Sequence, residues 1–337
     1  PCVMYVRAFD RPFRRKRPML GRFALALPAV LLLVPALHAQ GTSSSPAPSV
    51  KLSGYIQGRE TYQKGVGIVG TINRARLSAA GGVAGNITWR IQGEFRTGNA
   101  GTGRASVSLQ DAYIRWTRNA LGVQMGQFKT PFTREFLTSL AEVETADRAT
   151  VVDSLAPKRD IGLMADYALG GRATVSAGLF NGEGQNVTAN TDSSALGVAR
   201  VTYRPIPSLV LAINAARYFA DSTRYGVDAS LEAPWIILRA EYIGQQRDGA
   251  GTADDKGWYA LAAAPVCPWL QPVFKYEWFD RPGVAPAGTL ENRAWTAGVN
   301  LFPWGRTTRL TLEYVSRKVG EPGVRRSLGL AQAQIIF

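Results

Sequence analysis

The feature that most constrains this sequence is a two-residue alternation of apolar and polar side chains, which starts at Lys51 and continues almost to Phe337. Successive side chains of a β-strand point to opposite faces, so one face of each such run suits lipid and the other suits water. Runs of about ten residues match the length that a tilted strand needs to cross a bilayer. The run 87–97 shows the two faces best: Ile87, Trp89, Ile91, Gly93 and Phe95 on one, and Thr88, Arg90, Gln92, Glu94 and Arg96 on the other.

Sixteen such runs predict sixteen strands, near 51–63, 71–80, 87–97, 106–118, 121–129, 160–168, 172–181, 194–205, 208–218, 223–233, 235–246, 256–264, 270–280, 292–302, 308–318 and 326–337. Short and long connections alternate; the long ones are expected at 130–159, 181–193, 246–256 and 280–291. A soluble β-sandwich also has two-faced strands, but it lacks this rhythm of connections. The pattern therefore predicts an all-β fold, a transmembrane antiparallel β-barrel of about 16 strands in a bacterial outer membrane.

Residues 1–39 have the features of a cleaved signal peptide. Residues 14–17 are basic, 23–37 are apolar, and Ala39 is a small residue suited to signal peptidase. The apolar stretch contains two prolines and is shorter than the roughly twenty residues of a membrane-spanning helix. We therefore predict three parts of the chain: the signal peptide 1–39, a Ser/Pro-rich periplasmic linker at 40–50, and the barrel at 51–337.

Composition excludes several classes of protein. The signal peptide holds seven of the 39 basic residues and one of the 25 acidic residues, so 32 basic and 24 acidic residues remain, a net charge of +8. The basic residues are spread singly along strands, which argues against nucleic-acid binding. The only histidine, His38, lies in the signal peptide, and Cys267 is the only cysteine after it. Histidine-dependent catalysis and His- or Cys-ligated metal sites are thus excluded, and we predict neither an enzyme nor a cofactor.

Two glycine-rich stretches do not indicate a nucleotide site. Residues 65–70 fit G-x-G-x-x-G, but an alternating, strand-like stretch follows where the dinucleotide motif requires a helix. Residues 98–105 resemble a P-loop in spacing, but Arg104 and Ala105 stand where Lys and Ser or Thr are required. We interpret both stretches as loops between strands.

Basic residues recur on the predicted inward faces of the strands. Guanidinium and ammonium groups concentrate anions in a narrow passage and repel cations. The alternative is that each inward charge only keeps the wall wet and pairs with an inward carboxylate. Because inward basic residues outnumber inward acidic ones, we predict that the following side chains line an anion pathway: Arg59, Arg74, Arg76, Arg90, Arg96, Arg115, Lys129, Arg200, Arg204, Arg239, Lys275, Arg309 and Arg317.

Residues 130–159 are the longest stretch without strand alternation. A loop of this length is functional or disordered, and Phe132, Phe136, Leu137 and Leu140 favour a packed loop. We predict that it folds into the barrel and narrows it.

The sequence resembles the phosphate-selective porin O and P family. The motifs that carry the resemblance are KLSGY at 51–55, GQFKTPF at 126–132, APKRDIG at 156–162, GLFNG at 178–182 and the terminal Phe337. The resemblance implies a sixteen-stranded barrel that assembles as a homotrimer, with the third extracellular loop folded inward as the constriction. A last strand that ends in an aromatic residue also resembles the signal read by the barrel assembly machinery.

The resemblance implies that Lys129 lies at the start of the constriction, with Arg74, Arg76 and Asp111 as its neighbours. The constriction loop carries Phe132, Arg134, Arg148, Lys158 and Arg159. The loop differs from the family pattern because Glu135, Glu142, Glu144, Asp147 and Asp153 offset its basic residues.

The sequence thus predicts a porin that passively conducts small anions, with phosphate or related oxyanions and chloride as candidates. The mixed charge of the loop leaves a weakly selective general diffusion porin as the alternative. An alternative of a different class is a non-conducting barrel with a structural or adhesive role. Besides anions, the expected partners are outer-membrane lipid, the assembly machinery and two further copies of the chain.

Overall fold

The computed structural model describes residues 50–83, 85–96, 106–249, 254–285, 288–319 and 324–337. The predicted signal peptide and the predicted linker up to residue 49 lie outside the described residues, so these assignments stay predictions. The P-loop-like stretch 98–105 also lies outside them. A strand rather than a helix follows the turn at 64–66, as the sequence predicted, but that strand already begins at Gly67, so residues 67–70 are not part of a loop.

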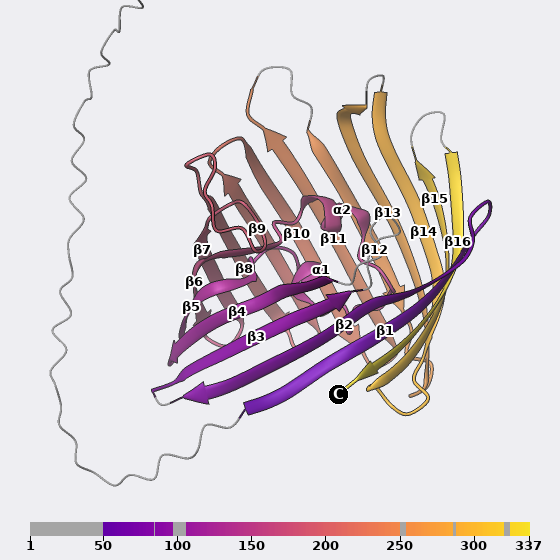
Figure 1. The fold of residues 1–337 in the computed structure, drawn as a ribbon, viewed down its shortest axis with the longest axis horizontal. Coiled ribbons are helices and arrows are strands. Elements are labelled where there is room, and N and C mark those ends of the chain that lie inside the picture. Colours follow the sequence, from indigo (N-terminus) through magenta and orange to yellow (C-terminus); the bar gives the residue numbers. More distant parts are fainter. Residues whose placement is uncertain (1–49, 84, 97–105, 250–253, 286–287, 320–323) are drawn as a thin grey trace, which may run out of the picture. The chain divides into compact units, whose positions relative to one another are not determined.

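Sixteen antiparallel strands form a closed barrel in the described part of the chain (Figure 1). Each strand pairs with its neighbours in the sequence, and the barrel closes where β1 pairs with β16, with Tyr55 opposite Ile336. The prediction of a 16-stranded barrel is confirmed. The strands are β1 (Val50–Gln63), β2 (Gly67–Val83), β3 (Ile87–Arg96), β4 (Ser106–Arg118), β5 (Leu121–Lys129), β6 (Arg159–Leu169), β7 (Ala173–Phe180), β8 (Leu196–Ile206), β9 (Leu209–Tyr218), β10 (Ser222–Ala233), β11 (Ile236–Arg247), β12 (Asp255–Ala263), β13 (Leu270–Ala285), β14 (Gly288–Leu301), β15 (Thr308–Val319) and β16 (Val324–Ile336).

Exposure along the strands follows the two-residue period of the sequence. In β12 every second residue is buried from Asp255 to Ala263, while Trp258 and the others between them are exposed. The exposed set includes large apolar residues on most strands, as a lipid-facing surface requires. The buried set faces the lumen, and this divides the wall into an outer apolar and an inner polar face.

Local irregularities adjust the register of the barrel. The ladder shifts between Gln57 and Gly58 in the β1–β2 pair and between Gln92 and Gly93 in the β3–β4 pair. Gly126 has φ of 128°, and a Cβ at this position would lie 2.2 Å from the carbonyl oxygen of Ala112. Only glycine allows β4 and β5 to approach this closely.

One predicted connection was wrong. The long loop expected at 280–291 is largely strand, because β13 continues to Ala285 and β14 already begins at Gly288. Proline and glycine at 282–283 suggested a loop, but the ladder shifts between Arg281 and Ala285. Proline is tolerated at such an irregularity because no ladder hydrogen bond is required of it there.

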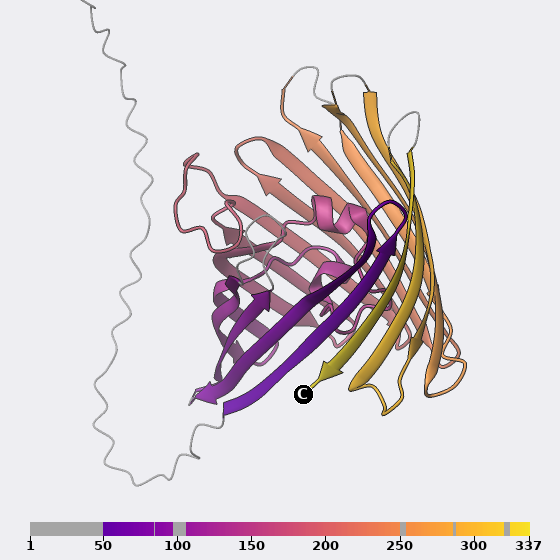
Figure 2. The same ribbon diagram turned by 45° about the vertical axis from the view of Figure 1, so that its right-hand side comes forward.

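The connection between β5 and β6 lies inside the barrel (Figure 2). We call residues 130–158 the inner loop. It contains two short helices, α1 (Arg134–Leu137) and α2 (Thr150–Leu155). Among the described residues no helix is long and apolar enough to span a membrane.

Candidate pore constriction

The inner loop is organised around Arg148. Its guanidinium donates hydrogen bonds to the carbonyl oxygens of Glu135, Phe136 and Thr138, at 3.0, 3.2 and 3.0 Å. It also lies 4.8 Å from the centre of the Phe136 ring. Since α1 is only one turn long, these bonds satisfy carbonyl groups that the helix itself leaves unpaired. Arg148 therefore gives the loop a fixed conformation.

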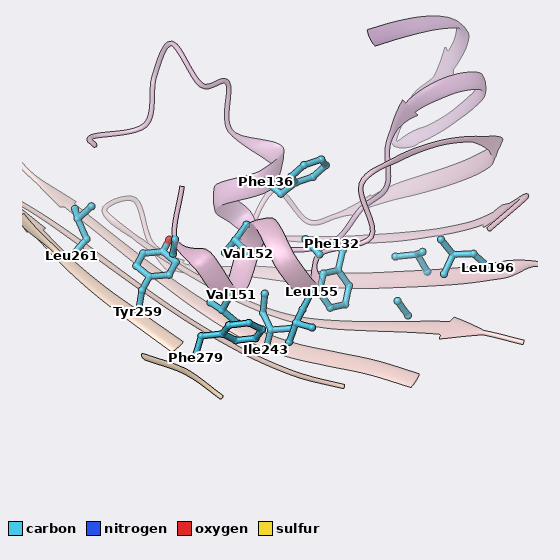
Figure 3. Close-up of a cluster of buried hydrophobic side chains, with 14 of the residues drawn as sticks. Phe132, Phe136, Val151, Val152, Leu155, Leu196, Ile243, Tyr259, Leu261 and Phe279 are labelled. Atoms are coloured by element: carbon cyan, nitrogen blue, oxygen red, sulfur yellow. The ribbon is translucent and has the colours of Figure 1, made fainter. Parts of the chain in front are cut away.

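One side of the inner loop is apolar and packs against the barrel wall (Figure 3). Phe132, Val152 and Leu155 are completely buried, in the same cluster as Ile243 of β11 and Tyr259 of β12. Burying a side chain of this size stabilises a structure by about 1.5–3 kcal/mol. The cluster thus fixes the loop to one part of the wall.

Polar side chains of the wall donate hydrogen bonds to the loop backbone. These donors come from strands far from the loop in sequence, and they replace the water that a loop carbonyl would otherwise bind. They are Gln57 to Leu140 O (3.3 Å), Gln334 to Ala141 O (3.0 Å), Arg309 to Val143 O (2.7 Å), Asn300 to Glu144 O (2.7 Å), Lys275 to Asp147 O (2.9 Å) and Arg224 to Leu155 O (2.9 Å).

Wall carboxylates accept hydrogen bonds from the loop in the same region. Glu241 accepts from the backbone N–H of Glu135 at 2.6 Å, and Glu313 accepts from that of Ala146 at 2.8 Å. Glu277 accepts from the hydroxyl of Thr150 at 2.6 Å. We call the inner face of β10–β16 and β1 the anchor wall, because its polar groups hold the loop from both its carbonyl and its N–H sides.

On its other side the inner loop borders a polar cavity of about 380 Å³. We call the inner face of β2–β6, which forms the opposite side of this cavity, the passage wall. The lining carries four basic and two acidic side chains, so its net charge is positive. The lining residues are Arg76, Arg90, Gln92, Asp111, Tyr113, Lys129, Leu137, Ser139, Glu142 and Arg159.

The basic groups of the cavity have different partners. Asp111 forms an ion pair of 2.7 Å with Arg159 and lies 3.8 Å from Arg90. Arg76 pairs with Glu94 at 2.7 Å. The ammonium group of Lys129 donates to carbonyl oxygens of the inner loop, at Leu137 and Thr138, both at 3.0 Å. Two peptide carbonyls thus hold the side chain of Lys129 in place beside the cavity.

The pKa shifts of two residues of the inner loop reflect burial and the charges around them. Burial lowers the pKa of Arg148, and the nearby charges of Arg74 and Arg76 lower it further, against the opposite effect of loop carboxylates. Arginine stays charged despite such a shift. The effects of Arg74 and Arg76 show that several basic groups lie close to Arg148. Burial also raises the pKa of Glu135 to about 7, although Lys275 and the N–H of Ala149 act against that rise.

The structure brings five of the predicted site residues together around the cavity: Arg76, Arg90, Asp111, Lys129 and Arg159. Another four contact the inner loop from the anchor wall, namely Arg59 through Asp147, Arg239 through Glu144, Lys275 through Asp147 O and Arg309 through Val143 O.

The remaining predicted residues are dispersed. Arg115 pairs with Asp166 at 2.7 Å and Arg200 with Asp228 at 2.5 Å, whereas Arg204 and Arg317 are exposed near strand ends. Arg74 lies close enough to Arg148 to affect its pKa, and the side chain of Arg96 is outside the described part of the chain. In the loop, Phe132 belongs to the apolar cluster, Arg134 lies 3.8 Å from Glu144, and Lys158 is exposed.

Five lining residues were not predicted from the sequence. Gln92 and Tyr113 alternate in phase with Arg90 and Asp111, so the strand pattern contained the signal for them. Leu137, Ser139 and Glu142 belong to the inner loop, where no periodicity shows which side chains face the cavity.

A closed barrel with an inner loop beside a charged polar cavity defines a porin. The chain belongs to the phosphate-selective porin O and P family, whose model matches residues 60–242, more than half of the sequence. It is therefore a porin of the bacterial outer membrane, a passive channel and not an enzyme. No curated protein sequence matches the chain.

Solved porin structures share the fold. The anion-selective porin from Comamonas acidovorans gives a TM-score of 0.64 at 15% identity and covers 86% of this chain and 100% of its own. In-vitro folded OmpT of Vibrio cholerae, in its trimer form, gives 0.63 at 11% identity with coverages of 86% and 100%. The DcaP channel of Acinetobacter baumannii gives 0.60 at 13% identity with coverages of 88% and 99%. At these identities the likeness concerns the fold alone.

Proposed function

We propose that this porin conducts small anions in preference to cations and that oxyanions such as phosphate are among its substrates. The observation that carries the proposal is the lining of the cavity beside the inner loop, where Arg76, Arg90, Lys129 and Arg159 meet. With Glu94 counted, because it pairs with Arg76, four basic groups stand against three acidic ones, and the net charge at the cavity is still positive. The resulting positive potential lowers the free energy of an anion in the cavity and raises that of a cation.

In the proposed mechanism, the cavity replaces part of the hydration shell of the anion with guanidinium and ammonium donors. Arg90, whose side chain is 37% exposed, and Lys129 are the donors most accessible to a passing ion. Binding stays weak, because Asp111 already accepts a hydrogen bond from Arg159 and places its negative charge 3.8 Å from Arg90. A weakly held ion can leave again, which conduction requires. The inner loop sets the size limit.

The comparisons support the direction of this proposal. The family is described as phosphate-selective, and the Comamonas acidovorans relative in fold is described as anion-selective. The second candidate, a general diffusion porin with little selectivity, is favoured by Asp111 and Glu142, which place negative charge on the same lining. A third, non-conducting barrel would need the cavity beside the loop to be closed to ions.

Planar-bilayer recording of the purified protein under a KCl gradient tests the proposal. We expect an anion-selective reversal potential and a chloride current that added phosphate reduces. Replacing Arg90 and Lys129 with Gln removes two basic side chains from the lining and should lower the anion-to-cation permeability ratio roughly fivefold or more. Arg217→Gln is the matched control, since Arg217 pairs with Asp248 at an exposed site away from the cavity.

Three results would contradict the proposal. Weakly selective ohmic steps in the wild type would establish the general diffusion porin. An absence of channel steps would establish the non-conducting barrel. A permeability ratio that is the same in the double variant and in Arg217→Gln would show that Arg90 and Lys129 do not act on the passing ion.

We further propose that the porin works as a homotrimer with its apolar outer face against lipid and neighbouring copies. The support is the porin family and the trimer form described for OmpT of Vibrio cholerae. A detergent-resistant species of about three times the monomer mass is expected; a monodisperse monomer in several mild detergents would contradict it. The assembly machinery would read β16 and Phe337, whose backbone N–H and carbonyl pair with Gly54.

A further inference from the structure

Glu142 occupies a special place on the inner loop. Its two neighbours are buried against the anchor wall, where the carbonyl of Ala141 accepts from Gln334 and that of Val143 accepts from Arg309. The backbone N–H of Glu142 itself donates to Ser139 O at 2.9 Å. Because the chain is fixed on both sides, the exposed side chain of Glu142 is directed away from the anchor wall. It lines the cavity opposite the passage wall.

Three other carboxylates near the inner loop have close cationic partners. Asp111 pairs with Arg159, Glu144 with Arg239 and Asp147 with Arg59, at 2.7, 3.0 and 2.9 Å. Within the part of the chain that the structure describes, the carboxylate of Glu142 forms no ion pair. Its full negative charge therefore acts on an ion that passes through the cavity.

We propose that Glu142 is a specificity-determining residue that makes the channel favour monovalent anions over divalent ones. The inference rests on the proposed anion conduction and specifies its substrate class: monocarboxylates and the monoanionic form of phosphate. The physical reason is a difference in scaling. The gain from a positive potential rises in proportion to the charge of the ion, whereas the cost of removing its water rises with the square of that charge.

A strongly positive cavity offsets the larger dehydration cost of a dianion, and a moderately positive one does not. Glu142 lowers the potential and so keeps the cavity only moderately positive. Consider a unit charge several ångströms from the ion in a water-containing passage. It changes the partition of a monoanion between bulk water and the cavity about fourfold, and that of a dianion by the square of that factor. Removing the charge should therefore raise the dianion-to-monoanion permeability ratio about fourfold.

The test compares wild type, Glu142→Gln and Glu142→Asp by reversal potentials in bilayers, with KCl on one side and K₂SO₄ on the other. Glu142→Gln should raise the sulfate-to-chloride ratio about fourfold, and Glu142→Asp, which keeps the charge, should stay close to wild type. Glu183→Gln is the matched control, because Glu183 is a carboxylate in the loop between β7 and β8, outside the cavity lining.

The outcomes separate this inference from the proposed function. An anion-selective wild type whose sulfate-to-chloride ratio is unchanged in Glu142→Gln would overturn the inference and leave the proposed function standing. So would a rise of equal size in Glu183→Gln, which would assign the effect to general surface charge. A wild type that prefers potassium in the KCl gradient would overturn the proposed function and, with it, the inference. Since the Glu142 side chain makes no ion pair among the described residues, Glu142→Gln is expected to fold normally.

Discussion

The anchor wall and the passage wall carry similar inward side chains but use them differently. On the anchor wall, cations such as Lys275 and Arg309 donate to loop carbonyls and are almost completely buried. On the passage wall, Lys129 also donates to loop carbonyls but borders an open cavity, and Arg90 borders that cavity with a side chain that is 37% exposed. An inward basic residue is therefore not a conduction residue by itself. Its role depends on whether protein or solvent occupies the space in front of it.

The difference also has an energetic side. A buried cation that loses its partner, or a partner that loses its cation, leaves an uncompensated charge at a cost of several kcal/mol. A partly exposed ion pair contributes little, because water can replace either partner. We thus expect substitutions on the anchor wall to change mainly stability and loop order, and those on the passage wall to change mainly ion selectivity.

The largest effect should come from Lys275→Met. The ammonium group lies 3.6 Å from Glu277 and donates to the loop at Thr145 and Asp147, and the side chain is nearly fully buried. Removing it leaves Glu277 without its cation, so the free energy of unfolding should fall by about 3–5 kcal/mol. Urea unfolding of the refolded barrel in detergent or lipid measures this change.

The matched variant for Lys275→Met is Arg90→Met on the passage wall. Arg90 lies farther from its carboxylate, at 3.8 Å from Asp111, and its side chain is 37% exposed. We expect little change in stability and a measurable fall in anion selectivity. Equal losses of stability in the two variants would contradict the distinction between the walls.

A smaller effect is expected from Leu155→Ala. Leu155 is completely buried in the apolar cluster that attaches the inner loop to the wall. Truncating a buried leucine costs about 2–5 kcal/mol, depending on how well the cavity closes. Hydrogen exchange of residues 130–158 should become faster, and channel current should become noisier. Leu137→Ala, on the same loop but 37% exposed, is the control; faster exchange of similar size there would contradict the role of the cluster.

Much of the barrel could be predicted from the sequence because strand periodicity is a local signal. The number of strands, most of their bounds and the position of the long loop follow from alternation alone. The extension of β13 beyond Asp280 does not follow from the sequence, because proline and glycine at 282–283 are typical of a strand end. Irregular pairing at the rim of a barrel accommodates such residues, and no local pattern shows it.

The assignment of side chains to the two walls could not be predicted in the same way. It depends on the path of the inner loop, which is fixed by contacts between residues far apart in the chain, such as Gln334 with Ala141. Alternation shows that Arg309 and Arg90 both face inward. It does not show that the loop covers one and not the other, and the same limitation explains why Glu142 was missed as a lining residue.

The smallest predicted effect is a pH dependence of the docking of the inner loop, which again distinguishes the anchor wall from the passage wall. Burial raises the pKa of Glu135 in the docked loop to about 7, whereas an undocked glutamate titrates near its ordinary value of 4.5. Below pH 4.5 the carboxyl is protonated in both states, and the docked loop keeps its full stability. As the pH rises from 4.5 to 7, the undocked state releases its proton more readily, so docking weakens through that window.

Hydrogen-exchange protection factors of residues 130–158, corrected for intrinsic rates, measure this dependence between pH 4.5 and 7.5. Glu135→Gln keeps a neutral acceptor for the N–H of Ala149, which lies 2.9 Å from the carboxylate, and should flatten the profile. Ion selectivity should change little in this variant, because Glu135 faces Glu241 of the anchor wall and not the cavity. If protection instead increased with pH in the wild type, the ionised form of Glu135 would be the one that the loop binds. The carboxyl would then have to be counted among the charge-paired anchors of the loop.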